Sequence, residues 1–387
     1  MTALQITLAA LVLLCLVLHL TGTGLALSAL RRPAPSNART DRPAITVLRP
    51  VCGMEHQLER TLTSTFLADY PNYEILFCVA SPDDAALPLL HRLIAAHPHV
   101  TARVLIGDDK ISGNPKLNNC AKGWRAAAYP YVLMADSNVL LPPDTLTRLV
   151  NQWAPDTGLV SSPPIGIEPT GFWARLECAF LNTFQARWQL AADRIGNGFA
   201  QGKMLFWQRD LLERAGGIAI LGGEMAEDVA ATKLVRATGL KVRLPARLFA
   251  QPIGPRAFST VWTRQLRWSR VRRLGFPLLF LPELLAGIAF PLLALLALVA
   301  TGLSPLTIPA FLFIWFGAEY LTANVGDWPR TPVDIAAWVL RDALLPGLWV
   351  ASWASSSFEW RGNAMTAAGD PSLAAAAARD PAQATKA

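Results

Sequence analysis

The chain has 387 residues, of which 52% are hydrophobic and only 16% are charged, and its mean hydropathy is +0.31. These values exclude an ordinary soluble globular protein and require that part of the chain lies in lipid. The formal charge is +7, and much of the excess lies beside an apolar region, so membrane headgroups are a more natural partner than nucleic acid.

Residues 4–30 form an uncharged apolar run that ends at Arg31 and Arg32. The run exceeds the roughly 20 residues that span a bilayer, so it predicts a transmembrane helix within 1–32. A cleaved signal peptide is the alternative, but the run is too long for one and lacks a basic start. The following segment, 33–43, is rich in Pro, Ser and charge and is interpreted as a linker.

Short apolar runs at 44–48, 73–79, 104–106 and 131–135 alternate with helical segments. This alternation predicts an α/β domain with a doubly wound, mostly parallel sheet. In such sheets ligands bind outside the carboxyl ends of the strands. The residues that follow each run are therefore the candidate site.

Pro50 and Glu55 follow the first run, and Asp83 and Asp84 follow the second. These acids could accept hydrogen bonds from a nucleoside, although an acid at a helix start also serves as a cap. The turn that ends at Lys116 can aim backbone N–H groups and one ammonium at an anion, and a phosphate would suit it.

Asp136 directly follows the fourth run and is the candidate metal ligand. Mg²⁺ or Mn²⁺ prefers oxygen ligands and usually shares them with substrate phosphates. Asn138 stands where a second acid would complete an Asp-x-Asp pair. The alternative is a solvated aspartate that caps the next turn.

The second half predicts a strand at 199–207, awkwardly interrupted by Gly202 and Lys203, and a helix at 229–238. Asp228 lies at the start of that helix, where an acid is favoured by the helix dipole whether or not it catalyses anything.

A basic helix is predicted at 261–273. Arg264 and Arg267 lie three residues apart and share a helical face, so together they could bind a diphosphate, with Trp268 beside them. The alternative is a basic interfacial helix with a purely topological role.

Three apolar stretches follow, at 276–303, 306–325 and 335–354. Charged residues in them, such as Arg341 and Asp342, are costly in lipid and are expected to pair. The basic residues that flank the apolar regions predict a multi-pass inner-membrane protein with a cytoplasmic catalytic domain. The complete division is a membrane helix at 1–32, a linker at 33–43, a catalytic domain at 44–255, an interfacial helix at 256–275, a membrane region at 276–355 and a tail at 356–387.

The chain resembles the inverting GT-A glycosyltransferases, and most closely the ceramide glucosyltransferases, here in a bacterial form related to the hopanoid-associated glycosyltransferases. The motifs that carry the resemblance are 48–53, 69–74, 113–119, 143–147, 226–228 and 264–268. It implies that Asp84 contacts the nucleoside, that Asp136 binds the metal and that Asp228 is the base. Arg264, Arg267 and Trp268 match the (Q/R)-x-x-R-W motif.

The resemblance further implies a UDP-sugar-dependent hexosyltransferase that moves glucose from UDP-glucose to the primary hydroxyl of ceramide, with Mg²⁺ or Mn²⁺. The uridine is expected near Pro50, Glu55 and Asp84, and the diphosphate near Lys116. A hopanoid, diacylglycerol or polyprenyl phosphate acceptor, and a polysaccharide synthase, stay open. A membrane transporter or lipid-binding scaffold with an inactive transferase domain is the rival from another class. Neither a protein partner nor nucleic acid is expected.

Overall fold

A computed structural model of the chain describes residues 2–32, 41–245, 247–360 and 363–365. Most of the predicted linker and tail lie outside these residues. The chain divides into two compact units. The helical unit comprises Met1–Arg32, Ile165–Ile195 and Ile253–Ser356, and the sheet unit comprises Pro33–Pro164, Gly196–Pro252 and Ser357–Ala387. Residues 165–195, predicted within the catalytic domain, therefore group with the helical unit.

The sheet unit contains a seven-stranded sheet with the order β3-β2-β1-β4-β7-β5-β8. Its strands are β1 (Ile45–Val51), β2 (Tyr73–Val79), β3 (Thr101–Ile106), β4 (Tyr131–Ala135), β5 (Thr157–Ser161), β7 (Met204–Gln208) and β8 (Lys241–Arg243). Strand β7 runs antiparallel to both β4 and β5, and the other pairings are parallel. The predicted mostly parallel α/β sheet is confirmed.

Helices cover both faces of this sheet. They are α2 (Leu58–Phe66), α3 (Leu87–Ala96), α4 (Pro115–Ala126), α5 (Thr145–Asn151), α8 (Arg209–Arg214), a 3-10 helix (Ile218–Gly223) and α9 (Glu227–Ala237). On β2, Leu76 packs in one cluster with Trp124 of α4, whereas its neighbours Ile75 and Phe77 pack in another with Leu62 of α2. Successive side chains of a strand point to opposite faces, so both faces are buried, which explains why the strands are continuous apolar runs.

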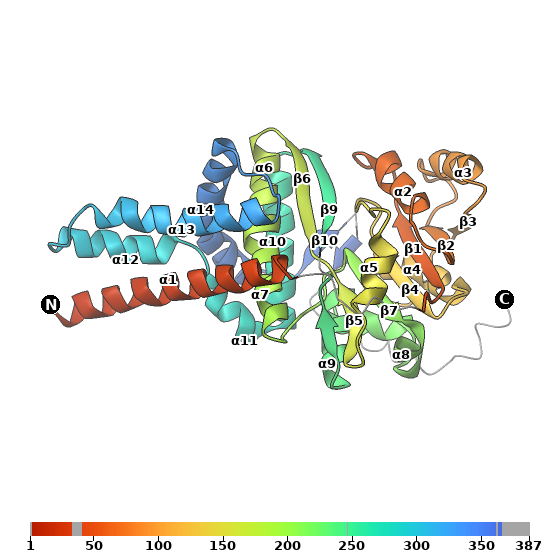
Figure 1. Cartoon of the computed structure of the whole chain (residues 1–387), viewed down its shortest axis with the longest axis horizontal. Coiled ribbons are helices and arrows are strands. Elements are labelled where there is room, and N and C mark those ends of the chain that lie inside the picture. The colour runs from red at the N-terminus through yellow and green to blue at the C-terminus, as the bar shows by residue number, and fades with distance from the viewer. Residues whose placement is uncertain (1, 33–40, 246, 361–362, 366–387) are drawn as a thin grey trace. The chain divides into compact units, whose positions relative to one another are not determined.

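The helical unit is built around long apolar helices. Its helices are α1 (Ala3–Leu30), α6 (Phe172–Ala179), a π-helical segment (Phe180–Ala186), α7 (Arg187–Arg194), α10 (Phe258–Gly275), α11 (Pro277–Phe280), a 3-10 helix (Leu281–Leu285), α12 (Ala289–Ala300), α13 (Thr307–Val325) and α14 (Pro332–Trp353). Within this unit α1 lies beside α12 and α13 (Figure 1). Two small sheets complete the described elements, β6 (Pro164–Thr170) with β9 (Phe249–Pro255) and β10 (Phe358–Trp360) with β11 (Asn363–Met365).

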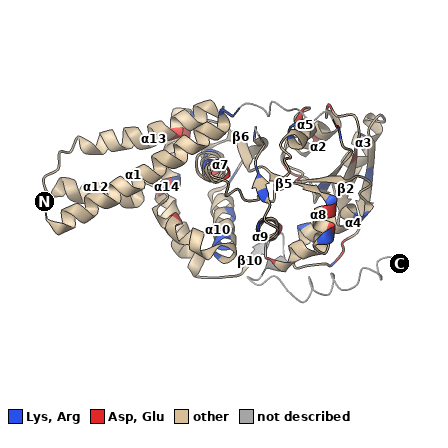
Figure 2. Ribbon diagram, turned by 60° about the horizontal axis from the view of Figure 1, so that its bottom comes forward, with Lys and Arg blue, Asp and Glu red and all other residues tan. Residues whose placement is uncertain are grey.

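Within the described residues, four helices are long and apolar enough to cross a bilayer: Ala3–Leu30, Pro277–Ala300, Thr307–Val325 and Pro332–Trp353. This agrees with the predicted arrangement of one N-terminal and three C-terminal membrane segments. Helices α1 and α12 contain no charged residue (Figure 2). On α1 the side chains of Leu4 and Leu13 are 65% and 62% exposed, and lipid would cover such apolar surface favourably. Helix α14 continues through Pro346.

Three charged side chains buried between α13 and α14 form an ionic cluster. Arg341 of α14 lies 2.8 Å from Glu319 of α13 and 2.7 Å from Asp342, and all three side chains are at most 1% exposed. Arg341 also donates to Thr183 Oγ1 at 2.5 Å, and Asp342 Oδ2 accepts from Trp315 Nε1 at 3.1 Å. The expected pairing of Arg341 with Asp342 is confirmed. Pairing of this kind is what makes buried charges tolerable in a low-dielectric environment.

Arg341→Met should destabilise the detergent-solubilised protein by about 3–5 kcal/mol, because it leaves two buried carboxylates without their counter-ion. Equilibrium or thermal unfolding would measure the loss. Val339→Met, at a position on the same helix that is 47% exposed, is the matched control. Unfolding of both variants at the same temperature would contradict the importance of the cluster.

Candidate active site

Two carboxylates from separate elements of the sheet unit meet at the ammonium group of Lys116. Its Nζ lies 2.7 Å from Asp136 Oδ1 and 2.8 Å from Glu227 Oε1, and it also donates to the carbonyl oxygen of Gly202. Lys116 belongs to the first turn of α4, Asp136 follows β4, and Glu227 begins α9. The structure thus brings together Lys116 and Asp136, which the sequence singled out separately.

Asn114 fixes the position of Lys116. As the N-cap of α4, its Oδ1 accepts from the backbone N–H groups of Lys116 and Leu117 at 3.0 and 3.2 Å, and Pro115 occupies the first helical position. The same side chain donates from Nδ2 to Glu227 Oε2 at 2.7 Å. The backbone N–H groups that were predicted to bind an anion therefore donate to Asn114 instead. The ammonium of Lys116 is the cationic group of this turn that contacts negative charge.

Arg49 holds the loop that carries Asp136. Its buried guanidinium donates from Nη2 to the carbonyl oxygens of Ser137 at 3.2 Å and Val139 at 3.1 Å. Burial lowers the pKa of Arg49 to about 10, against the opposing charge of Asp136. Glu55 Oε2 accepts from Ser137 Oγ at 3.1 Å. Strand β1 and the chain that follows it thus position the loop after β4.

Asp136 faces an ammonium on each of its oxygens. Lys203 Nζ lies 2.9 Å from Asp136 Oδ2 and 2.9 Å from Asn138 Oδ1, while Lys116 is bound to the other carboxylate oxygen. Burial would raise the pKa of Asp136, but the two ammonium groups have the larger effect and hold the pKa well below its usual range.

The strand that was predicted to begin at residue 199 begins only at Met204. Lys203 lies in the turn before β7, and no role for it was predicted from the sequence.

Asp228 has a different environment. Its Oδ2 accepts from the Gly202 N–H at 2.9 Å, and its Oδ1 accepts from the Val229 N–H at 2.9 Å. Burial and the adjacent negative charge of Glu227 raise the pKa of Asp228 to about 6. A Cβ at Gly202 would lie 2.6 Å from Glu227 Oε1, so a larger residue there would require the Glu227 carboxylate to shift. A carboxylate with a pKa near the working pH is suited to general-base chemistry.

The nucleoside candidates lie at the ends of β1 and β2. Asp84 accepts from the Gly53 N–H at 2.9 and 3.0 Å through both carboxylate oxygens, and from the Ala86 N–H at 2.8 Å. It therefore links the loops after the two strands. Asp83 is exposed, and Pro50 lies within β1. Their contact with a nucleoside stays a prediction.

The residues around Asp136 fit a cation that is shared with a ligand. Among the described residues, no group of three or more His, Cys, Asp or Glu side chains could hold a metal by itself. However, Asp136 Oδ2 and Asn138 Oδ1 both bind the single ammonium of Lys203, so two oxygens already converge on one positive charge. Mg²⁺ is commonly held by one or two carboxylates together with substrate phosphates. This donor set suits that arrangement.

The predicted arginine motif belongs to the helical unit. Arg264 of α10 forms an ion pair with Glu177 of α6, a fully buried carboxylate that also accepts from Arg256 Nε at 3.1 Å. Trp268 packs against a cluster of that unit that includes Cys178. Arg267 lies on the same helix and is partly buried. Glu177 was not predicted from the sequence, where the only signal for it is that it is the single acid of the helical segment 172–189.

Residues 4–373 match the family described as glycosyl transferase family 21. The chain belongs to this family. It is 26% identical over 331 residues to ceramide glucosyltransferase 3 of Caenorhabditis elegans, an alignment that covers 83% of this chain and 72% of the relative. It is also 41% identical over 111 residues to the ceramide glucosyltransferase of Komagataella phaffii, covering 28% of this chain and 22% of the relative. The predicted resemblance to the ceramide glucosyltransferases is confirmed.

The family 21 chain also resembles a solved mannosyltransferase from Pyrobaculum calidifontis in complex with GDP-Man and Mn²⁺. The TM-score is 0.51 at 18% identity, covering 91% of this chain and 97% of that chain. At 18% identity this similarity shows a shared fold and nothing beyond it. Together with the mostly parallel sheet, it confirms the predicted GT-A fold.

Proposed function

We propose that this family 21 protein transfers glucose from UDP-glucose to the primary hydroxyl of ceramide, with inversion at the anomeric carbon, to give glucosylceramide. The relatives named ceramide glucosyltransferase support the choice of substrates. The observation that carries the chemistry is the environment of Asp228, a carboxylate with its pKa raised to about 6, in the same strand-end cluster as Lys116 and Asp136.

The donor would bind over the carboxyl ends of the strands, the usual ligand site of such sheets. Its uridine would lie near Pro50, Glu55, Asp83 and Asp84. The Lys116 ammonium would bind the diphosphate. Asp136 would hold a divalent cation, Mg²⁺ or Mn²⁺, which when bound neutralises negative charge on the departing UDP.

Asp228 would act as the general base. Its carboxylate takes the proton from the acceptor hydroxyl while that oxygen attacks the anomeric carbon from the face opposite UDP. The new carbon–oxygen bond forms as the bond to UDP breaks, and the electron pair leaves with UDP. One displacement inverts the anomeric configuration and gives a β-glycoside. The N–H groups of Gly202 and Val229 orient the carboxylate.

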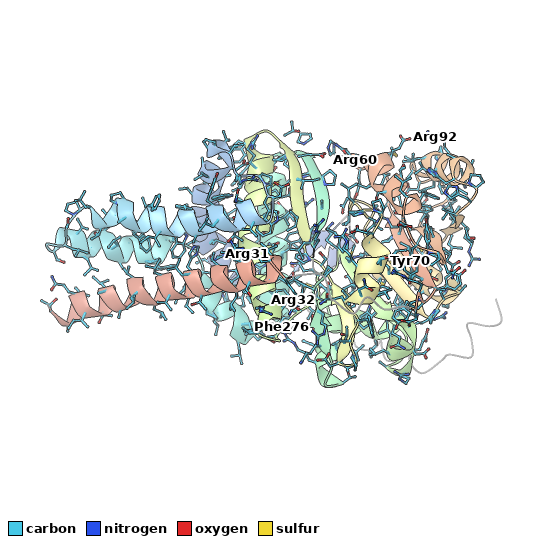
Figure 3. The ribbon with its side chains drawn as sticks, in the orientation of Figure 1. Arg31, Arg32, Arg60, Tyr70, Arg92 and Phe276 are labelled. Carbon is cyan, nitrogen blue, oxygen red and sulfur yellow. The ribbon has the colours of Figure 1, made fainter. Side chains whose placement is uncertain are left out.

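The apolar helices would place the enzyme in the bilayer that contains its lipid acceptor. Arg31 and Arg32 lie at the end of α1 (Figure 3), and α10 carries a further basic group before the next apolar helices. Positive charge beside membrane helices favours the cytoplasmic side. We therefore infer an inner-membrane enzyme whose sheet unit faces the cytoplasm.

We assign Arg264, Arg267 and Trp268 to the diphosphate on the strength of their motif. Guanidinium groups bind phosphate through paired hydrogen bonds, which a lysine cannot reproduce.

One assay tests substrates and acceptors together. The purified protein is incubated with labelled UDP-glucose, UDP-galactose or UDP-GlcNAc against ceramide, diacylglycerol, a hopanoid and a polyprenyl phosphate. Labelled glucosylceramide is the expected product. If a different lipid is labelled, that lipid is the acceptor, and a labelled polymer would indicate a polysaccharide synthase. Absence of both transfer and donor hydrolysis would favour a non-catalytic scaffold.

Asp228→Asn should retain UDP binding but lower turnover by at least about a hundredfold, the usual scale for a lost general base. Turnover is measured by labelled-lipid formation, and UDP binding by calorimetry. Asp210→Asn, at an exposed position on α8, is the control. Turnover near the wild-type value would exclude Asp228 as the base.

The rate should fall as the pH decreases through about 6, because the pKa of Asp228 is raised to about 6 and only the deprotonated base accepts a proton. Glu227→Gln removes the neighbouring charge that raises this pKa, so the acidic limb of the kcat/KM profile should move to lower pH. A limb that stays in place would mean that another group titrates.

Arg267→Lys should lower kcat/KM by roughly tenfold, corresponding to about 1.5 kcal/mol for one hydrogen bond to a charged group. The charge is kept and only the paired geometry is lost. Arg270→Lys, on the same helix outside the motif, is the control. Equal rates for the two variants would leave the motif with a topological role.

A further inference from the structure

Lys203 occupies the place of a cation in the sheet unit. Its ammonium lies 2.9 Å from both Asp136 Oδ2 and Asn138 Oδ1. Those two residues stand at the positions of an Asp-x-Asp pair, so the ammonium lies where a cation bridging that pair would lie. The Lys203 and Asp136 side chains are only 17% and 20% exposed. This is a partly buried contact and not a surface ion pair.

The sheet holds Lys203 in this position. Strand β7 pairs antiparallel with β4, with Met204 opposite Ala135. The ladder continues by one bond, in which the Asp136 N–H donates to the Lys203 carbonyl oxygen at 3.1 Å. The backbone of Lys203 is thus fixed beside Asp136. Its side chain needs only to fold over the Asp136 carboxylate to reach Asp136 Oδ2 and Asn138 Oδ1.

The charges of the cluster explain why a second ammonium is needed there. Asp136, Glu227 and Asp228 carry up to three negative charges, and Lys116 is already shared between Asp136 and Glu227. Lys203 supplies the remaining positive charge on Asp136 Oδ2. Because Asn138 is neutral, a divalent cation would gain only one formal negative charge from the pair and would meet the repulsion of Lys203.

We propose that Lys203 is a built-in substitute for the divalent cation. Its ammonium must be displaced before Asp136 and Asn138 can hold a metal. Without nucleotide, Lys203 keeps the metal affinity low. The diphosphate of the donor supplies the negative charge that both attracts the metal and receives the displaced ammonium. Lys203 is accordingly a positioning residue that couples metal binding to donor binding. The inference rests on the proposed function only for the diphosphate nature of the donor.

The test measures Mn²⁺ binding to the full-length protein in detergent by electron paramagnetic resonance, without nucleotide. Lys203→Met should tighten Mn²⁺ binding by roughly tenfold, because it removes the repulsion between the Lys203 ammonium and a nearby divalent cation. Lys203→Gln, which also removes the charge, should behave alike and guards against a folding defect in the first variant. Lys203→Arg keeps the charge and should stay near the wild-type affinity. Lys233→Met removes a lysine that pairs with Glu224, away from this contact, and controls for net charge.

Adding UDP provides a second readout. UDP should increase the Mn²⁺ affinity of the wild-type protein by a larger factor than that of Lys203→Met, because the variant has no ammonium to displace.

Unchanged or weaker Mn²⁺ binding in both neutral variants would overturn the proposal. Mn²⁺ binding by Lys203→Arg as tight as that expected for Lys203→Met would show that the positive charge at position 203 does not control the metal affinity. Equal effects of UDP on wild type and Lys203→Met would overturn the coupling. None of these measurements requires sugar transfer, so an inactive protein with the expected Mn²⁺ affinities would refute the proposed function and leave this inference standing.

Discussion

The ammonium group of Lys116 ties the loop after β4, the start of α9 and the turn before β7 to one point. It does so because Asn114 caps α4 and delivers Lys116 to the strand ends, while the same Asn114 also bonds Glu227. Burial alone would lower the pKa of Lys116, but Asp136 and Glu227 raise it well above its usual range. Lys116 therefore stays protonated. Its positive charge offsets the repulsion between the Asp136 and Glu227 carboxylates, which can then lie close together.

Much of the sheet and part of the candidate site could be predicted from the sequence. The bounds of β2 and β4 agree with the predicted runs, since each is a buried, mostly apolar strand bounded within two residues by a polar one, Ser81 after β2 and Asp136 after β4. Asp136 and Lys116 could be found because the carboxyl ends of parallel strands and the starts of the following helices meet at one edge. These are local patterns combined with one general rule of topology.

The features that escaped prediction depend on long-range pairing. Lys203 reaches Asp136 only because β7 inserts antiparallel between β4 and β5, and no local pattern around Gly202 indicates that register. Glu177 has its partner Arg264 on a helix 87 residues away. The π-helical segment Phe180–Ala186 is another such case, since its Thr183 accepts from the buried Arg341. In each case the partner, and not the residue itself, defines the role.

The two aspartates of the sheet unit illustrate how one cluster can separate two chemical tasks. Asp136 is surrounded by ammonium groups, which hold its pKa well below its usual range, so it stays ionised and suits a cation or a diphosphate counter-charge. Asp228 receives two backbone N–H groups, yet burial and the charge of Glu227 raise its pKa to about 6. Carboxylates whose pKa values are driven apart by their surroundings mark the division between a permanent charge and a proton acceptor. Glu227 links the two, because it shares Lys116 with Asp136 and repels a charge on Asp228, so a change in the Lys116 contact alters both sites together.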